Sequence, residues 1–169
     1  MLTKTDIERY FIAEKQVGLI LAIVGIVAII AAILCWLLLR TQFYKGAALP
    51  LLIIGLFQLY IGISLQKRSD AHRVRNVYAF DMNPQELKEK ELPRMQQAYK
   101  TITSFLTGEL VLLLAGLIVV VLYRSKPERA WWLGLGVALV IQCLIMAGAE
   151  FNARQKAKTF IDKLVAFKA

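Results

Sequence analysis

Four long stretches without charged side chains dominate this sequence. Residues 17–39, 46–65 and 130–149 contain no Asp, Glu, Lys or Arg, and residues 101–123 contain one, Glu109. Each stretch holds 20 to 23 residues, and a helix of about 20 residues crosses the ~30 Å apolar core of a bilayer. Since 58% of the 169 residues are hydrophobic, little is left for a separate water-soluble domain. The sequence therefore predicts an all-α, polytopic membrane protein with four transmembrane helices and helical extensions.

The segments outside these spans also carry helical patterns. Residues 66–100 continue from the second span, and Asn83 followed by Pro84 is typical of a helix start. Residues 151–169 form an amphipathic tail that we expect on the inner leaflet or on the 66–100 segment. Its apolar stripe consists of Ala157, Phe160, Ile161, Leu164 and Val165. We therefore treat 1–169 as a single membrane domain.

The distribution of Lys and Arg predicts the orientation of the spans. Both ends of the chain and residues 66–100 lie on one side of a four-span arrangement and carry 16 basic residues, against five in the two short connections. The positive-inside rule then places both termini in the cytoplasm of a bacterium, with the spans in its inner membrane. Anionic lipid of the inner leaflet accounts for the net charge of +9. No nucleic-acid partner is expected.

The two halves of the chain align without a gap at an offset of 84 residues. The aligned pairs are Arg40 with Arg124, Lys45 with Arg129, Gln58 with Gln142, and Gly25 with Glu109. Four pairs can also arise by chance between two apolar hairpins, so the sequence leaves duplication open. A true repeat would give two hairpins of the same orientation, related by an axis along the membrane normal.

Polar residues inside the spans share one depth. Glu109 lies eight residues into its span, and Gln58 and Gln142 each lie seven residues before the end of theirs, about 10–12 Å from the same membrane face. Gly25 reaches this depth on the first span and allows a neighbouring helix to approach closely. We interpret these four residues as an intramembrane polar layer with a binding or a structural role.

Glu109 is the residue of this layer with the largest energetic consequence. An ionised carboxylate facing lipid costs several kcal/mol, so Glu109 should face the bundle, be protonated, or accept hydrogen bonds from Gln58 and Gln142. It could then serve as a proton or cation site, as a contact for a partner, or as a neutral group that fixes helix register. Glu150 and Asn152 follow at the cytoplasmic mouth of the fourth span, where caps are expected more than ligands.

The sequence lacks the residue sets on which most catalytic sites depend. His72 is the one histidine, so neither a multi-histidine metal site nor a haem held by two histidines can form. There is no glycine-rich phosphate loop, nucleophile elbow or zinc-protease motif. We expect no enzyme activity, no metal and no cofactor.

One short segment resembles a known group. Asn83-Pro84, seven residues, then Leu92-Pro93-Arg94-Met95 opening the third span is similar to a segment of small uncharacterised bacterial four-span membrane proteins. The architecture is also similar to that of immunity proteins that protect bacterial inner membranes from pore-forming toxins. That similarity implies a binding function and assigns no residues. Small Glu-dependent drug and proton exchangers also have four spans, but their carboxylate lies in the first helix.

These observations favour a binding protein that recognises another membrane protein within the bilayer. Neutralisation of a pore-forming toxin is the concrete version of this hypothesis. One alternative is an oligomeric, proton-coupled small transporter or channel centred on Glu109. A second alternative is a structural or assembly subunit of a membrane complex. A homo-oligomer is compatible with each of them.

Overall fold

The computed structural model describes residues 2–167, which form helices joined by short connections. The long helices are α1 (Lys4–Leu34), α2 (Gln42–Met82), α4 (Leu92–Tyr123) and α5 (Ala130–Val165), and α3 (Pro84–Glu86) is a single turn. Wider π-helical turns follow α1 at Cys35–Leu39 and precede α4 at Leu87–Glu91, and a 3-10 turn (Pro127–Arg129) precedes α5. The described part contains no strand. The predicted all-α fold is confirmed, with four helices long and apolar enough to cross a membrane.

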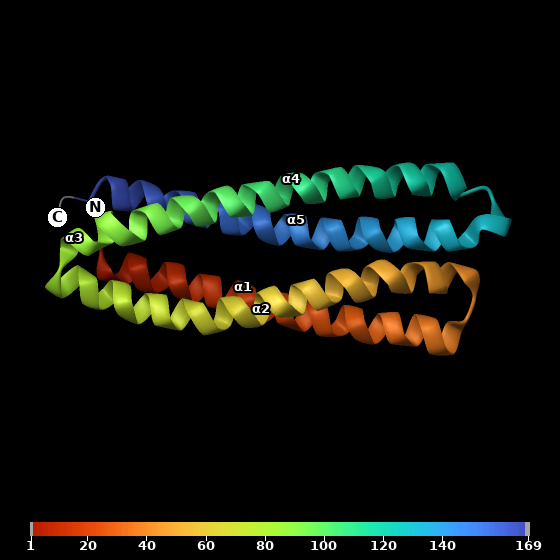
Figure 1. Ribbon diagram of the computed structural model, residues 1–169, viewed down its shortest axis with the longest axis horizontal. Helices are drawn as coiled ribbons and strands as arrows, with labels where there is room; N and C mark the ends of the chain where they lie inside the picture. Colours follow the sequence, from red (N-terminus) through yellow and green to blue (C-terminus); the bar gives the residue numbers. More distant parts are fainter. Residues whose placement is uncertain (1, 168–169) are drawn as a thin grey trace.

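The four long helices form two antiparallel hairpins that lie side by side (Figure 1). The first hairpin is α1 with α2, the second is α4 with α5, and α2 packs against α5 where the hairpins meet. Both ends of the chain and α3 lie at one end of the bundle, which we call the terminal end (Figure 1). The two short connections, near Arg40 and Lys126, lie at the other end, which we call the turn end.

Local sequence explains where the helices begin and end. Thr3 caps α1, because its side chain accepts a hydrogen bond from the backbone N–H of Asp6 while the Asp6 carboxylate accepts one from the backbone N–H of Thr3. Arg40 adopts a left-handed conformation with φ of 50°, and its Nε donates to the Leu37 carbonyl at 2.8 Å. This residue ends the first span. α3 begins at Pro84, with Asn83 as the preceding cap residue, as the sequence predicts.

Glycines allow the backbones to approach closely within the first hairpin and between the hairpins. A methyl group added at Gly25 would lie 2.6 Å from the Gly55 carbonyl oxygen, and one added at Gly62 would lie 2.5 Å from the Gly18 carbonyl oxygen. At the turn end, a methyl group on Gly134 would lie 1.8 Å from the Phe43 carbonyl oxygen. These helices therefore pack backbone against backbone, as small residues permit in membranes.

The terminal end extends beyond the apolar spans and has a core of its own. α2 runs past the second span to Met82 and α5 runs past the fourth to Val165. Buried apolar side chains from all the long helices and from the Leu87–Glu91 turn meet there, among them Ile7, Phe11, Ala79, Leu87, Met95, Ala157, Phe160 and Leu164. Four residues of the predicted stripe, Ala157, Phe160, Ile161 and Leu164, thus pack against protein as part of α5 itself, whereas Val165 is exposed. Residues 168–169 of the predicted tail lie outside the described residues.

Ion pairs surround this core. The Glu91 carboxylate is 1% exposed and accepts hydrogen bonds from Arg94 at 2.9 Å and from Arg75 at 3.2 Å. Lys163 near the end of α5 donates to Asp6 at 2.7 Å, and this hydrogen bond holds the pKa of Asp6 below its usual value. These contacts join the start of α1 to the end of α5, and the Leu87–Glu91 turn to α2 and α4.

Candidate functional site

The two intramembrane glutamines form a hydrogen bond between the hairpins. The Gln58 side-chain nitrogen donates to the Gln142 side-chain oxygen at 3.0 Å, and the two residues are 0% and 3% exposed. They are the pair that the 84-residue offset aligns. Residues related by a two-fold axis contact each other only near that axis. The hydrogen bond therefore fits two equivalent hairpins with an axis running between α2 and α5.

Glu109 does not join this pair. Its Oε2 atom is covered, yet it accepts no hydrogen bond from any described residue. Glu109 lies on α4. The most apolar stretch of this helix is 11% buried, whereas the corresponding stretches of α1 and α5 are 33% buried. A covered carboxyl oxygen without a donor is costly in an apolar environment. The expected bonds from Gln58 and Gln142 are absent from the described structure, because Gln58 donates to Gln142 and the Gln142 amide donates to no described side chain; the Gln58 oxygen is itself buried without a partner.

Gly25 serves the close helix approach that its sequence position predicts. Beside the Gly55 contact, a methyl group at Gly25 would lie 2.7 Å from the Leu59 backbone nitrogen. Gly25 therefore belongs to the α1–α2 interface. Of the four residues of the predicted polar layer, the structure brings the two glutamines together by hydrogen bonding and leaves Glu109 apart.

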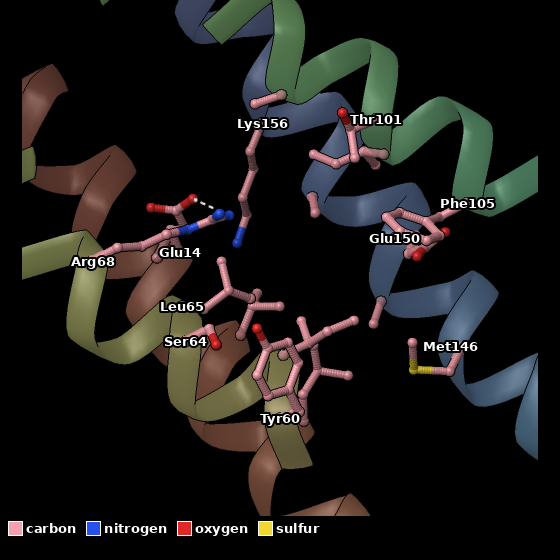
Figure 2. A pocket seen from close by; sticks show the side chains of 18 of the residues that line it. Glu14, Tyr60, Ser64, Leu65, Arg68, Thr101, Phe105, Met146, Glu150 and Lys156 are labelled. Carbon is pink, nitrogen blue, oxygen red and sulfur yellow. Dashed lines mark ion pairs between the residues drawn. The ribbon is translucent and has the colours of Figure 1, made fainter. Parts of the chain in front are cut away.

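A cavity of about 560 Å³ lies between the two hairpins toward the terminal end (Figure 2). All four long helices line it. Its inner walls are mostly apolar and include Val17, Leu21, Phe57, Ile61, Phe105 and Met146. Its outer walls carry the charged residues Glu14, Arg68, Arg94, Glu150 and Lys156. The cavity thus passes from apolar to charged surroundings at the level where the apolar spans end.

The charged groups of the outer walls are unequally paired. Arg94 is held by the buried Glu91 carboxylate. Arg68 approaches Glu14 at 3.7 Å, while the Glu14 carboxylate accepts a hydrogen bond from Ser69 at 2.7 Å. Within residues 2–167, Lys156 forms no ion pair. Figure 2 shows the Arg68 and Lys156 side chains extending toward the same part of the cavity from α2 and α5.

The two residues predicted at the mouth of the fourth span have different surroundings. Glu150 lines the cavity, and its Oε2 atom is covered and lacks a hydrogen-bond partner in the described part of the chain. Asn152 is exposed and does not line the cavity. Glu150 is therefore a candidate ligand-binding group, which the sequence had favoured as a cap.

Sequence reasoning missed the other polar residues of the cavity. Arg68 and Lys156 belong to the basic segments that the positive-inside rule already explains, so no further signal marked them. Tyr10 also lines the cavity, and burial raises the pKa of its phenol.

No group of three His, Cys, Asp or Glu side chains that could hold a metal ion occurs within the described residues. Comparisons with family models, with curated proteins and with solved structures find no match.

Proposed function

We propose that this chain is a multi-pass protein of a bacterial inner membrane that recognises another membrane protein within the bilayer. The observation that carries the proposal is the covered Glu109 oxygen without a hydrogen-bond donor. It lies on α4, whose apolar stretch is the least buried of the four. A partner helix that supplies a donor to Glu109, once its side chain rotates to bring the covered oxygen to the helix surface, would remove the cost of this unmade bond.

The surface beside Glu109 leaves room for such a helix. A methyl group added at the adjacent Gly108 would meet nothing within 4 Å. Bulky apolar side chains exposed elsewhere on α4, such as Leu114 and Val121, are suited to lipid. A glycine next to a membrane carboxyl allows a second backbone to approach, and small residues favour such approaches between helices. We therefore place the recognition surface on α4 around Gly108 and Glu109.

The concrete version of the proposal is neutralisation of a pore-forming toxin, with both termini in the cytoplasm. A membrane protein that binds a toxin within the bilayer needs no catalytic group, and the proposal invokes none. The orientation rests on the 16 basic residues at the terminal end against five at the turn end. Reporter fusions within residues 83–90 should read cytoplasmic, and fusions at Gln42 or Lys126 should read periplasmic.

Site-specific photo-crosslinking in growing cells tests the recognition surface. A photoreactive side chain at Gly108 should give one discrete adduct, whereas the same group at the lipid-facing Leu114 should give none. The adduct should persist in Glu109→Gln, which keeps an oxygen acceptor, and disappear in Glu109→Leu. An adduct of equal strength in Glu109→Leu, or none at Gly108, would contradict the proposal. Growth of cells challenged with a toxin encoded beside this gene then tests the toxin version.

A second candidate function is a proton-coupled transporter or channel centred on Glu109. The covered oxygens of Glu109 and Glu150, both without a hydrogen-bond donor among the described residues, favour it because Glu150 lines the open cavity and a carboxyl group inside a span can hold a proton. Proton-driven flux in proteoliposomes would then occur in the natural chain and vanish in Glu109→Gln, which cannot titrate. Flux of this kind at unchanged expression would overturn the recognition proposal.

A further inference from the structure

The cavity between the hairpins has the chemistry of a binding site that recognition at Glu109 does not use. We propose that it holds one phospholipid from the leaflet at the terminal end, whose headgroup contains a phosphate and a primary amine. Phosphatidylethanolamine has this headgroup. The proposal is independent of the partner recognised by α4, since the cavity lies between the hairpins and Gly108 and Glu109 do not line it.

The depth and polarity of the cavity fit a lipid better than a wholly soluble ligand. Its inner walls belong to the apolar spans, and Lys156 lies seven residues beyond the predicted end of the fourth span, about 10 Å along the helix. A molecule filling the cavity would be apolar at one end and charged at the other. A phospholipid has this form, and its headgroup lies at this level of a bilayer.

The phosphate would bind between Arg68 and Lys156. Both side chains extend toward the same part of the cavity (Figure 2). Arg68 has one carboxylate partner among the described residues of the cavity, Glu14, at 3.7 Å. Two cations drawn together repel each other unless an anion lies between them. The N–H groups of both would donate to the phosphate oxygens, and charge-assisted hydrogen bonds of this kind are the strong ones. Exposure of Arg68 and Lys156 leaves this end of the cavity accessible.

The amine would bind at Glu150. This carboxyl group lines the same cavity, and its covered Oε2 atom has no donor among residues 2–167. A primary ammonium offers three N–H donors, and rotation of the Glu150 carboxyl group toward the cavity would let one of them satisfy this oxygen. A quaternary ammonium, as in phosphatidylcholine, carries the same charge without an N–H group. Glu150 should therefore distinguish the two lipids, while Arg68 and Lys156 should not.

Below the headgroup, an acyl chain would lie along the apolar inner walls. Val17 and Leu21 of α1 face this space with Phe57 and Ile61 of α2, and Met146 closes it from α5. Without an apolar occupant, the apolar side chains of these walls would remain uncovered inside the protein. The same headgroup without acyl chains lacks this contact and should bind much more weakly.

Native mass spectrometry of the full chain in detergent tests the proposal with short-chain phosphatidylethanolamine and phosphatidylcholine. Phosphatidylethanolamine should bind about tenfold more tightly, which corresponds to one charge-assisted hydrogen bond. Glu150→Gln should abolish most of this preference. Lys156→Ala should weaken the binding of both lipids, whereas Lys158→Ala, which removes an exposed lysine outside the cavity, should change neither. Thermal unfolding of each variant establishes that it is folded.

Three results would overturn the assignment. Equal binding of the two lipids by the natural chain would exclude a role for a primary amine. Unchanged binding in Lys156→Ala would exclude the phosphate position. Glycerophosphoethanolamine, the same headgroup without acyl chains, binding as tightly as the lipid would assign the cavity to a soluble ligand. None of these results bears on crosslinking at Gly108, so failure of the lipid site and failure of the recognition surface are distinguishable.

Discussion

The first and second hairpins make equivalent contacts at positions 84 residues apart. Lys15 of α1 donates to Asp70 of α2 at 2.5 Å, and Arg154 of α5 donates to Tyr99 of α4 at 3.1 Å. Both pairs are separated by 55 residues, and adding 84 to the first pair gives the second. The helices of the two hairpins are therefore paired in the same register, although the contacting side chains have changed.

The hairpins differ in how many glycines bring their helices together. In the first hairpin, methyl groups added at four glycines would lie 3.1 Å or less from atoms of the opposite helix: Gly18, Gly25, Gly55 and Gly62. In the second hairpin the same holds for two glycines, Gly116 and Gly136, which lie nearer the turn end. The equivalent positions of the second hairpin hold Ile102, Glu109, Leu139 and Met146. Two of these larger residues, Ile102 and Met146, line the cavity, and a third is the unpartnered carboxyl group. The comparison separates a close-packed scaffold from a hairpin that carries the candidate functional groups.

The largest loss of stability is expected when a glycine of the first hairpin is replaced by the residue at the equivalent position of the second. In Gly62→Met, the new side chain would start 2.5 Å from the Ala22 backbone nitrogen and the Gly18 carbonyl oxygen, so the helices must separate. We expect a loss of about 3 kcal/mol of unfolding free energy, the upper part of the usual range for overpacking. Unfolding of the purified chain by increasing SDS measures it. The matched control is Gly148→Met, where nothing lies within 4 Å, and equal stability of the two variants would contradict the comparison.

The reverse replacement, of a second-hairpin residue by the glycine of the first, should reduce stability less. Met146 is 3% exposed, and Met146→Gly removes its side chain from the α5 wall of the cavity. We expect a loss of about 2 kcal/mol, at the lower end for such truncations, because lipid is as apolar as the vacated site. The same SDS titration measures it, with Met146→Leu as the volume-matched control. A Met146→Gly variant as stable as the natural chain would show that this residue does not support the second hairpin.

The sequence predicts the spans and the alignment of the hairpins because both depend on the order of residues along the chain. Lack of charge over 20 or more residues marks a span, and Gln58 and Gln142 mark equivalent depths. The hydrogen bond between these two glutamines was not predicted, since it depends on which helix faces which. Their shared depth in the membrane indicated Glu109 as a partner, but the two glutamines meet where α2 contacts α5 and Glu109 on α4 does not join them.

The cavity and the core of the terminal end depend on packing between distant segments. Phe160 carries an apolar stripe that fits either a membrane surface or a protein core, and the stacking of Tyr10 on its ring at 4.5 Å decides for protein. Lys156 and Arg68 are indistinguishable in sequence from basic residues that face lipid headgroups. They line the cavity because of the helix faces on which they lie, and a single sequence does not show which helix faces meet.

An intermediate effect is expected where the hairpins remain equivalent. Replacing Gln58 or Gln142 singly by Leu leaves the other amide without a partner, and we expect each change to cost about 1 kcal/mol. The double replacement should cost less than the sum, with a coupling energy of about 0.6 kcal/mol and at most ~1.7 kcal/mol, as for polar contacts in membranes. A double-mutant cycle in the SDS titration measures this coupling. Strict additivity would show that the hydrogen bond does not join the hairpins.

The smallest effect on stability is expected at His72, whose equivalent position 84 residues further along the chain is Lys156. Lys156 is exposed at the cavity, whereas His72 is partly buried with its ring 6.2 Å from that of Phe11. Burial, followed by the positive charge of Arg94, lowers the pKa of His72 below its usual value of 6.5, while the charge of Glu91 opposes this shift and those of Arg75 and Arg68 add to it. The unfolded chain therefore binds a proton more readily than the folded one. Stability should fall as pH is lowered through and below 6.5 and level off below the pKa of the folded state.

Unfolding free energies between pH 5 and 8 test this expectation. The natural chain should lose stability toward the lower end, and His72→Gln, which cannot titrate, should remove the part of the slope that lies near and below pH 6.5. Lys156→Gln is the matched control, because it introduces the same side chain at the exposed equivalent position and leaves the histidine in place. The same slope in His72→Gln as in the natural chain would show that the histidine is solvated equally in both states. The different surroundings of the two equivalent positions would then have no consequence for stability.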